Sequence, residues 1–304
     1  MDPKEAYEKV FQEVKKHIAG NEETIKLIFV ALTANGHILL EGVPGIAKTT
    51  MTKTMAETID ASFGRVQGMP DIEISDIIGY AYLDESHNVV LKKGPIFNNM
   101  LLIDELNRMP PKTTTALLEA LEERQVTIGN STLPLTKPFI ALATQNPLNI
   151  EGTTQLPKVL TDRFLMRVEV TYPSMEEEEE MLRIKEKEEQ IIVNKVIGKE
   201  DILEMQSLVN SIEMPDEVEN YITKLVEATR KDIHVVMGAS PRAEISFMKC
   251  SKAKALIEGR KSITIDDVKY LAKAVLSHRV VARATGGIGV GGIINGIVAT
   301  LPSG

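Results

Sequence analysis

One segment of the chain combines glycine, lysine and threonine at the spacing of a phosphate-binding loop. The apolar run His37–Leu40 leads into Gly42-Val-Pro-Gly-Ile-Ala-Lys-Thr49, and a helical pattern follows. The segment fits the pattern GxxxxGK followed by Ser or Thr, except that Ala47 stands where glycine is usual. Glycines let backbone N–H groups turn toward phosphate oxygens, and the start of the following helix adds favourable dipole charge. We therefore expect this segment to bind the phosphates of ATP.

The residue types of this loop indicate separate contacts to phosphate and to metal. Lys48 is expected to reach the β- and γ-phosphates, and the Thr49 hydroxyl is expected to bind Mg²⁺. Alanine at position 47 can still adopt a right-handed conformation, so it weakens the match only slightly. The residues expected to contact the nucleotide here are Gly42, Val43, Pro44, Gly45, Ile46, Ala47, Lys48, Thr49 and Thr50.

Two adjacent carboxylates supply the second half of the expected site. The apolar run Met100–Ile103 ends in Asp104 and Glu105. A carboxylate at the end of a strand can bind Mg²⁺ indirectly, which suits Asp104. Glu105 is then placed to orient and deprotonate the attacking water. The alternative is a strand that happens to end in surface acids, but the loop and the carboxylate pair together predict ATP hydrolysis.

Alternating strands and helices must position these residues. Apolar runs of strand character occupy 37–40, 63–67, 100–103 and 139–144, and helical patterns occupy 3–16, 24–34, 48–59 and 113–124. Buried strands that alternate with helices predict a parallel sheet covered on both faces. The predicted fold class is therefore α/β, of the P-loop nucleoside triphosphatase kind.

The character of the chain changes after residue 173. Ser174 and Glu177 have the spacing of a capping box, and the residues beyond them have helical patterns. The run Glu176–Glu180 fits a solvated first turn better than an acidic interaction patch, because carboxylates favour the positive end of a helix. We therefore predict a nucleotide-binding α/β core over residues 1–173 and a helical lid domain over 174–304.

Composition narrows the class of protein and its partners. The chain has 304 residues, enough for two domains, and its hydrophobic content of 43% is ordinary for a globular protein. The net charge of −8 argues weakly against broad non-specific binding of nucleic acid. The single Cys250 excludes an intrachain disulfide, and the five histidines show no zinc-site spacing. No apolar run is long enough to span a membrane, so we expect a cytoplasmic protein without membrane insertion.

A glycine-rich stretch, residues 284–296, contains a second pattern associated with nucleotides. Gly287-Ile-Gly-Val-Gly-Gly292 fits GxGxxG. No strand precedes it and no room remains for an acidic partner downstream, so we do not expect a dinucleotide site. We expect instead an adaptable tail that packs on its own domain or on a neighbouring one.

Several further segments occur in a characteristic order and spacing. They are Ile18-Ala-Gly-Asn-Glu22, Leu40-Glu-Gly-Val-Pro-Gly-Ile-Ala-Lys-Thr49, Ile103-Asp-Glu-Leu-Asn-Arg108, Leu117-Leu-Glu-Ala-Leu-Glu-Glu-Arg-Gln-Val126, Ala143-Thr-Gln-Asn-Pro147, Leu160-Thr-Asp-Arg-Phe-Leu-Met-Arg167, Gly238-Ala-Ser-Pro-Arg242, Ala255-Leu-Ile-Glu-Gly-Arg260 and Leu276-Ser-His-Arg279. From about Ile18 to Val281, this order resembles the MoxR family of AAA+ ATPases. Ala47 looks normal for that family.

The resemblance implies catalytic roles for three more polar residues. Asn146 resembles sensor 1, which helps Glu105 to position water; the alternative is a turn residue. Arg163 resembles the arginine finger, which acts on a neighbouring subunit's nucleotide because it stabilises charge developing on the γ-phosphate; the alternative is a surface arginine in an ion pair. Arg242 resembles sensor 2, and the sequence leaves open whether it serves its own nucleotide or a neighbour's.

The resemblance also implies contacts around the nucleotide and between subunits. Ile18 and Gly20 lie in the segment that packs on the adenine, although Asn21 departs from the more usual glutamine. Asn107 and Arg108 follow the family pattern, and we expect an intersubunit role for them.

Two inserts refine the resemblance. Residues 79–99 and 125–137 each have strand-like runs on either side of a polar turn, which is typical of a hairpin. They resemble the helix-2 insert and the pre-sensor-1 hairpin of MoxR-type proteins. In a ring such hairpins would lie toward a pore or one face, where a client protein binds.

The implied function is that of an ATP-hydrolysing, chaperone-like protein that remodels or activates partner proteins. The resemblance implies a homo-oligomer, a hexameric ring, and client proteins that include von Willebrand factor A domain proteins. A nucleic-acid-dependent motor is one alternative, but the hairpin tip Asp84–Asn88 is acidic and Gly129–Ser131 has no Lys or Arg. A slow, nucleotide-switched scaffold is the other, and the presence of Glu105 and Arg163 argues against it.

Overall fold

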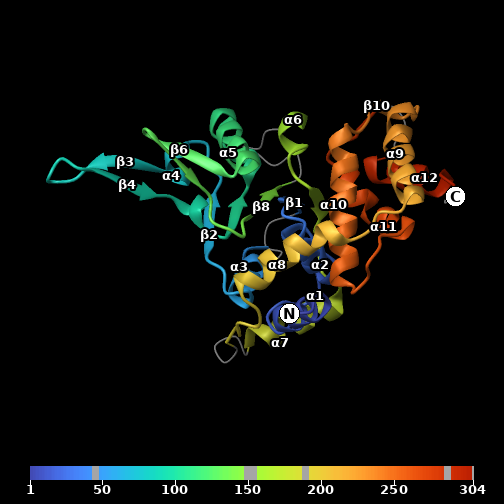
Figure 1. Cartoon of the computed structure of the whole chain (residues 1–304), viewed down its shortest axis with the longest axis horizontal. Coiled ribbons are helices and arrows are strands. Elements are labelled where there is room, and N and C mark those ends of the chain that lie inside the picture. The colour runs from blue at the N-terminus through green and yellow to red at the C-terminus, as the bar shows by residue number, and fades with distance from the viewer. Residues whose placement is uncertain (43–47, 147–155, 187–191, 284–288, 303–304) are drawn as a thin grey trace.

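A five-stranded sheet forms the centre of the N-terminal half of the chain. The computed structural model describes residues 1–42, 48–146, 156–186, 192–283 and 289–302. All strand pairs in this sheet are parallel, in the order β2–β5–β8–β1–β9 (Figure 1). The strands are β1 Ile38–Glu41, β2 Phe63–Gln67, β5 Met100–Asp104, β8 Ile140–Gln145 and β9 Met166–Glu169. The predicted α/β fold class is confirmed.

Helices cover both faces of this sheet, because successive strand residues are apolar and point to opposite sides. Ile38 and Leu40 of β1 belong to a hydrophobic cluster with α1, α2 and α3, whereas Leu39 belongs to a cluster with α4 and α5. These helices are α1 Pro3–Lys15, α2 Glu22–Thr33, α3 Lys48–Thr58, α4 Ile74–Ile78 and α5 Pro111–Glu123. Continuous apolar strands of this kind are typical of parallel sheets buried on both sides.

The carboxyl ends of the strands bring distant parts of the sequence together. Glu41 of β1 lies opposite Gln145 of β8, and Gln67 of β2 lies opposite Asp104 of β5. The short helix η2 Leu106–Arg108 directly follows β5 at this edge, whereas α6 Lys158–Thr161 leads into the amino end of β9. Ligands of open parallel sheets bind at this edge, so the fold itself places the candidate site there.

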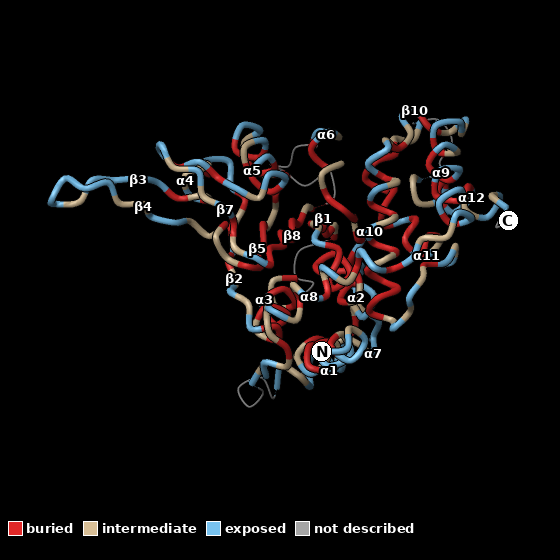
Figure 2. Tube along the Cα trace, viewed as in Figure 1, coloured by how far each residue is buried: buried red, intermediate tan, exposed pale blue. Residues whose placement is uncertain are grey.

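Two antiparallel hairpins are present where the sequence predicts inserts. β3 Gly79–Leu83 pairs with β4 Val89–Lys93, and β6 Gln125–Ile128 pairs with β7 Ser131–Pro134. The 3-10 helix η1 Pro95–Phe97 connects β4 to β5. The β3–β4 hairpin extends away from the rest of the molecule (Figure 1), and most of its trace is exposed (Figure 2).

Helices dominate the C-terminal half, with one short ribbon of strands among them. The helices are α7 Met175–Glu186, α8 Lys199–Leu208, η4 Val209–Ser211, α9 Asp216–Lys231, α10 Pro241–Ile257, α11 Ile265–Leu276 and α12 Val290–Thr300. β10 Val235–Met237 pairs with β11 Val281–Ala282, so the prediction of helices alone is wrong at this ribbon. Strands of two or three residues are too short to show an alternating pattern in the sequence.

The predicted capping box at the start of α7 is present. The Ser174 backbone N–H donates to the Glu177 carboxylate (2.7 Å), and the Glu177 N–H donates to the Ser174 hydroxyl (3.3 Å). This reciprocal pair satisfies two N–H groups that the first turn of a helix leaves without partners.

The glycine-rich stretch 284–296 differs in part from the expected adaptable tail. Residues 284–288 lie outside the part of the chain that the structure describes. From residue 290 onward the chain forms α12, which packs on α9 and α11 of its own lid. Ile293, Ile294 and Ile297 are buried there at helical spacing. Apolar periodicity therefore outweighs the low helix propensity of the glycines.

One hydrophobic cluster joins the two halves of the chain. Buried side chains of α1 and α2 share it with those of α10 and α11, and α10 contacts both N-terminal helices. The division of the chain at residue 173 stays a prediction.

A buried charge network reinforces this contact between α2, α10 and α11. The Asp267 carboxylate, 3% exposed, accepts hydrogen bonds from Lys254 (2.8 Å) and from Arg260 (2.6 and 2.8 Å). Glu258 accepts hydrogen bonds from Lys26, Lys254 and Arg260. Burial by itself would raise the pKa of Asp267, but hydrogen bonds from Arg260 and Lys254 lower it to about 2.

Replacing Asp267 with asparagine should therefore destabilise the protein by about 3 kcal/mol, because part of the charge of Lys254 and Arg260 loses its buried partner. A carboxylate whose folded pKa is lowered stabilises the fold above its unfolded pKa of about 3.9, and this contribution is lost as pH falls through about 2. Urea unfolding at about pH 7 and at about pH 3 checks both effects, since the variant should lose less stability than wild type on acidification.

Asp266→Asn is the matched control for this change. The Asp266 carboxylate is 92% exposed, so its removal should change stability by less than about 0.5 kcal/mol. Equal stability of Asp267→Asn and wild type at neutral pH would show that the network contributes nothing.

Candidate functional site

The predicted phosphate-binding residues and carboxylates converge at the carboxyl edge of the sheet. α3 begins at Lys48, and the half-buried Thr49 and Thr50 follow in its first turn. Asp104 ends β5, and β8 lies between β5 and β1. Asn146 directly follows β8, so it lies between the loop and the carboxylates. The predicted loop residues Val43, Pro44, Gly45, Ile46 and Ala47 lie outside the described residues.

Lys48 is buried with its ammonium group directed back toward the start of the loop. Its Nζ donates to the Gly42 carbonyl oxygen (2.9 Å). Burial lowers the pKa of Lys48, and the charges of Asp104 and Glu105 oppose this change. The cation is therefore close to both carboxylates, and its contact with the β- and γ-phosphates stays a prediction.

Gly42 cannot carry a side chain in this arrangement. A Cβ atom at this position would lie 2.4 Å from the carbonyl oxygen of Val170, which is backbone and cannot easily shift. The backbone just after β1 therefore packs directly against the backbone just after β9. Glycine at the first position of the loop pattern is thus required by packing.

Asp104 is held by two neighbouring strands. Its carboxylate accepts a hydrogen bond from the Thr144 hydroxyl of β8 (2.7 Å) and pairs with Arg65 of β2 (2.8 Å). Carboxylate and hydroxyl oxygens are the protein ligands that Mg²⁺ prefers, and such sites take only one or two of them besides phosphates. Asp104 and Thr49 fit this donor set, even though the described residues contain no cluster of three or more metal-binding side chains.

Glu105 has the most constrained side chain at this edge. Its backbone is left-handed (φ 54°), and its N–H donates to the Thr144 hydroxyl (2.9 Å). Its carboxylate accepts hydrogen bonds from Gln67 (3.0 Å), Arg108 (2.8 Å) and Asn146 (2.9 Å). A left-handed conformation is uncommon for a non-glycine residue, and strained residues of this kind cluster at functional sites as well as at turns. The three donors fix the direction of a carboxylate that can accept a proton from water.

Asn146 is itself fixed by Asn107 of η2. The Asn107 amide nitrogen donates to the Asn146 carbonyl oxygen (3.2 Å), and the Asn146 N–H donates to the Asn107 side-chain oxygen (3.4 Å). Asn107 and Arg108, for which we expect an intersubunit role, therefore contact Asn146 and Glu105 within one chain. The sensor 1 candidate lies where it could share a water molecule with the base.

Three residues at this edge are absent from the predicted site. They are Arg65 and Gln67 of β2 and Thr144 of β8, which contact Asp104 or Glu105. The sequence shows that polar residues occur on these strands, but which carboxylate each of them contacts depends on which strands are neighbours.

A cavity of about 280 Å³ lies beside α3, and its lining includes His17, Thr49 and Thr50. Ile18, the neighbour of His17 in the chain, is buried, and Gly20 has φ +64°, with the Glu177 carboxylate 2.5 Å from where a Cβ would lie. Ile18 and Gly20 are not among the residues that line this cavity. The structure therefore places two of the predicted phosphate contacts at the cavity, but not the two predicted adenine contacts.

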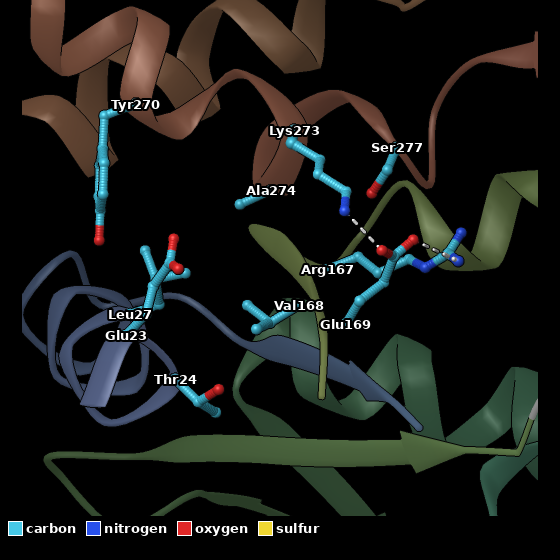
Figure 3. A pocket seen from close by; sticks show the side chains of 10 residues that line it. All are labelled: Glu23, Thr24, Leu27, Arg167, Val168, Glu169, Tyr270, Lys273, Ala274 and Ser277. Atoms are coloured by element: carbon cyan, nitrogen blue, oxygen red, sulfur yellow. Dashed lines mark ion pairs between the residues drawn. The ribbon is translucent and has the colours of Figure 1, made fainter. Parts of the chain in front are cut away.

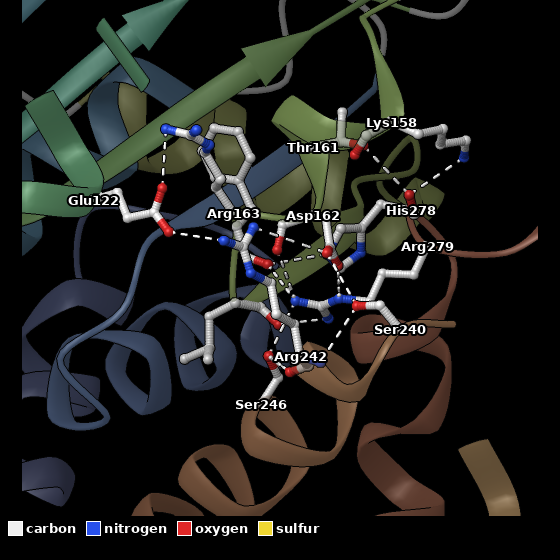
Figure 4. A network of polar contacts seen from close by, with 12 residues as sticks. Glu122, Lys158, Thr161, Asp162, Arg163, Ser240, Arg242, Ser246, His278 and Arg279 are labelled. Carbon is white, nitrogen blue, oxygen red and sulfur yellow. Dashed lines mark hydrogen bonds and ion pairs between the residues drawn. The ribbon is translucent and has the colours of Figure 1, made fainter. Parts of the chain in front are cut away.

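Arg163 and Arg242 lie apart from Lys48 and Glu105, and both contact the carboxylate of Glu122. Arg163 pairs with one oxygen of Glu122 on α5 (3.0 Å), and Arg242 pairs with the other (3.0 Å) (Figure 4). Within the described ranges, neither arginine contacts Lys48 or Glu105. The structure therefore brings the two predicted arginines together at a second place on the surface.

A smaller cavity of about 140 Å³ lies between α2, β9 and α11 (Figure 3). Three of its charged side chains pair with each other, since Lys273 lies 2.6 Å and Arg167 lies 3.7 Å from the Glu169 carboxylate. None of the predicted site residues lines it. This cavity is therefore separate from the candidate site.

Comparisons with known proteins agree with this geometry. The profile of the ATPase family associated with various cellular activities (AAA) matches residues 37–166, and that of the AAA lid domain matches residues 227–288. The chain is 40% identical to YeaC, an uncharacterized protein of Bacillus subtilis, over 89% of this chain and 85% of YeaC. It is 38% identical to the chaperone MoxR1 of Mycobacterium tuberculosis, over 90% of this chain and 75% of that protein. A crystal structure from Cytophaga hutchinsonii, assigned provisionally as an ATPase, superposes with a TM-score of 0.91 at 37% identity and covers 99% of this chain and 95% of that one.

Proposed function

We propose that this chain, which belongs to the MoxR family of AAA+ ATPases, hydrolyses ATP and uses the reaction to remodel or activate partner proteins. The observation that carries the proposal is the Glu105 carboxylate, held by Gln67, Arg108 and Asn146 at the end of the strand that also presents Asp104. Such a carboxylate beside a buried lysine is suited to hydrolysis at a phosphate.

Within one chain, each residue has a separate task. Lys48 and the N–H groups at the start of α3 bind phosphate oxygens. Thr49 and Asp104 would hold Mg²⁺, which neutralises negative charge on the β- and γ-phosphates when bound. Asn146 orients the attacking water, and Glu105 accepts its proton.

A neighbouring copy of the chain completes the site. Arg163 and Arg242 both lie on Glu122, away from Lys48, so we propose that both act on the nucleotide of the next subunit. Contacts of this head-to-tail kind close into a ring, and family membership supports a hexamer. Each hydrolysis event then depends on how two subunits are placed.

The β3–β4 hairpin is the proposed contact for client proteins. Tyr80, Tyr82, Leu83 and Val89 are between 46% and 69% exposed on it. Exposed aromatic and aliphatic side chains suit a protein partner, and a von Willebrand factor A domain protein is the proposed class. A nucleic-acid track is not favoured, because the tip of this hairpin, Asp84–Asn88, is acidic.

We propose a cytoplasmic location for this activity. Cys250 is free and buried, which suits a reducing compartment. In the part of the chain that the structure describes, no helix combines the length and apolarity needed to cross a bilayer.

Purified protein should release phosphate from ATP with Mg²⁺, and Lys48→Ala should weaken ATP binding by about 10- to 100-fold, because it removes a charge-assisted contact to phosphate. Titration with a fluorescent ATP analogue measures this affinity. Lys224→Ala, an exposed position on α9, is the control and should bind like wild type. Equal affinities of Lys48→Ala and Lys224→Ala would contradict the assignment of the loop.

The proposed action on partners needs a second experiment. Glu105→Gln, held in ATP, should retain a von Willebrand factor A domain protein that Lys48→Ala does not retain. If turnover were instead stimulated by DNA or RNA, with stimulation falling as salt rises, the chain would be a nucleic-acid motor.

A further inference from the structure

The segment just after α11 contacts the backbone on both sides of Arg163. We call the contacts between His278–Arg279 and Asp162–Leu165 the lid–finger clamp (Figure 4). The two segments are more than 100 residues apart in the sequence, and Arg163 lies in the middle of one of them.

Arg279 makes most of the clamp. Its side chain is only 2% exposed. Its Nε donates to the Asp162 carboxylate (2.8 Å), and its Nη2 donates to the carbonyl oxygens of Phe164 (2.7 Å) and Asp162 (3.3 Å). Its Nη1 donates to the carbonyl oxygen of Leu165 (3.3 Å). One guanidinium therefore holds the backbone just before and just after Arg163.

Further hydrogen bonds hold the loop to the lid. His278 Nε2 bonds the Phe164 carbonyl oxygen (3.0 Å). Lys158 donates to the His278 carbonyl oxygen (3.2 Å), and the Ser240 hydroxyl donates to the Asp162 carboxylate (3.1 Å). Ser240 is the N-cap of α10, two residues before Arg242. Arg242 is itself part of the lid, and Asp162, which precedes Arg163, is thus bound to the same end of α10.

A simple anchor between a loop and a helix would not require this chemistry. Removing a guanidinium from water costs several kcal/mol in general, and an apolar side chain of similar volume is often as stabilising. A planar guanidinium with five fixed donors does set the position and angle of the groups it binds. The chemistry of the clamp therefore suits a role in placing Arg163 better than a role in stability alone.

We propose that Arg279 is a positioning residue, which fixes Arg163 to the lid so that movement of the lid moves the arginine presented to the next subunit. This inference rests on the proposed function, because it assumes that Arg163 acts on a neighbour's ATP. A subunit with a weakened clamp therefore keeps a working nucleotide site of its own, but it does not place Arg163 correctly at the ATP of the next subunit.

Arg279→Lys tests this distinction, because lysine keeps the charge but cannot bind all four groups. We expect unchanged affinity for a fluorescent ATP analogue and at least tenfold slower turnover in the homo-oligomer. Arg283→Met, an exposed position on the chain just beyond β11, is the control and should turn over ATP like wild type.

Mixed assemblies separate positioning from general damage to the lid. Arg279→Lys mixed with Glu105→Gln should regain turnover, because the second subunit supplies a correctly placed Arg163. Arg279→Lys mixed with Arg163→Ala should not, because neither subunit supplies one. Failure of the first mixture, or turnover equal to wild type without mixing, would overturn the proposal.

Hydrogen exchange tests the clamp without reference to turnover. Amides of residues 158–165 should exchange at least tenfold faster in Arg279→Lys, while those of α3 should not change. If wild type hydrolysed no ATP, the proposed function would fail, and unchanged exchange would separately overturn the clamp. If Arg279→Lys fails to fold, the same measurements are made on Asp162→Asn, which removes only the carboxylate charge.

Discussion

Replacing Glu105 with glutamine should lower ATP turnover by about 10²–10⁴-fold and leave ATP bound, because the amide cannot accept a proton from water. Glutamine keeps the length and shape of the side chain, and Lys48 and the loop are untouched. The protein should therefore accumulate in its ATP-bound form, which brings a neighbour's arginine and the γ-phosphate together and stabilises the ring. Phosphate release, nucleotide binding and light scattering measure the three effects.

Glu119→Gln is the matched control for this prediction. Glu119 lies on α5 and is exposed, so the same change of charge and shape should leave turnover unaltered. Turnover of Glu105→Gln equal to that of Glu119→Gln would mean that another group accepts the proton. Weak ATP binding by Glu105→Gln would instead mean that the carboxylate acts mainly by holding Arg108 and Gln67.

The parts of the site that the sequence predicts are those whose chemistry is local. Lys48 is specified by the loop around it, and Asp104 and Glu105 are specified by the apolar strand that they end. Parallel strands bring such local patterns to one edge, so the fold class was enough to predict that they would meet. Asn146 was identified through its position in a family motif.

The parts that the sequence does not predict depend on pairing between strands. Thr144 contacts both Asp104 and Glu105 only because β8 lies beside β5, and Gln67 reaches Glu105 only because β2 lies on its other side. Strand order is a property of the whole chain, which no local pattern contains. The β10–β11 ribbon was missed for the same reason, since two short segments form it across more than 40 residues.

Glu122 shows the same limit at the second cluster. It lies in a helix that the sequence predicts, and nothing in its neighbours distinguishes it from the exposed carboxylate of Glu119. Only the tertiary structure shows that Arg163 and Arg242 share it. The motif leaves open whether Arg242 acts on its own nucleotide or on a neighbour's. The shared contact bears on this question, because two arginines on one carboxylate can move together to a phosphate.

Arg163→Ala should lower turnover by about 10³–10⁵-fold, the range for loss of an arginine finger, without weakening ATP binding to the same chain. Its binding site is intact because Arg163 contacts Glu122 and not Lys48. Arg183→Ala, whose guanidinium is 72% exposed on α7, is the control and should retain full turnover.

The decisive feature of Arg163→Ala is its complementation by Glu105→Gln, although each is inactive alone. Where an Arg163→Ala subunit receives the arginine of a Glu105→Gln neighbour, the site has both groups. In a random equimolar ring about one quarter of sites meet this condition, so turnover should recover toward one quarter of wild type. An arginine acting within its own chain would give no recovery. Dilution of the unmodified protein makes the same distinction. Activity per subunit should fall as the protein is diluted only if the site is shared between subunits.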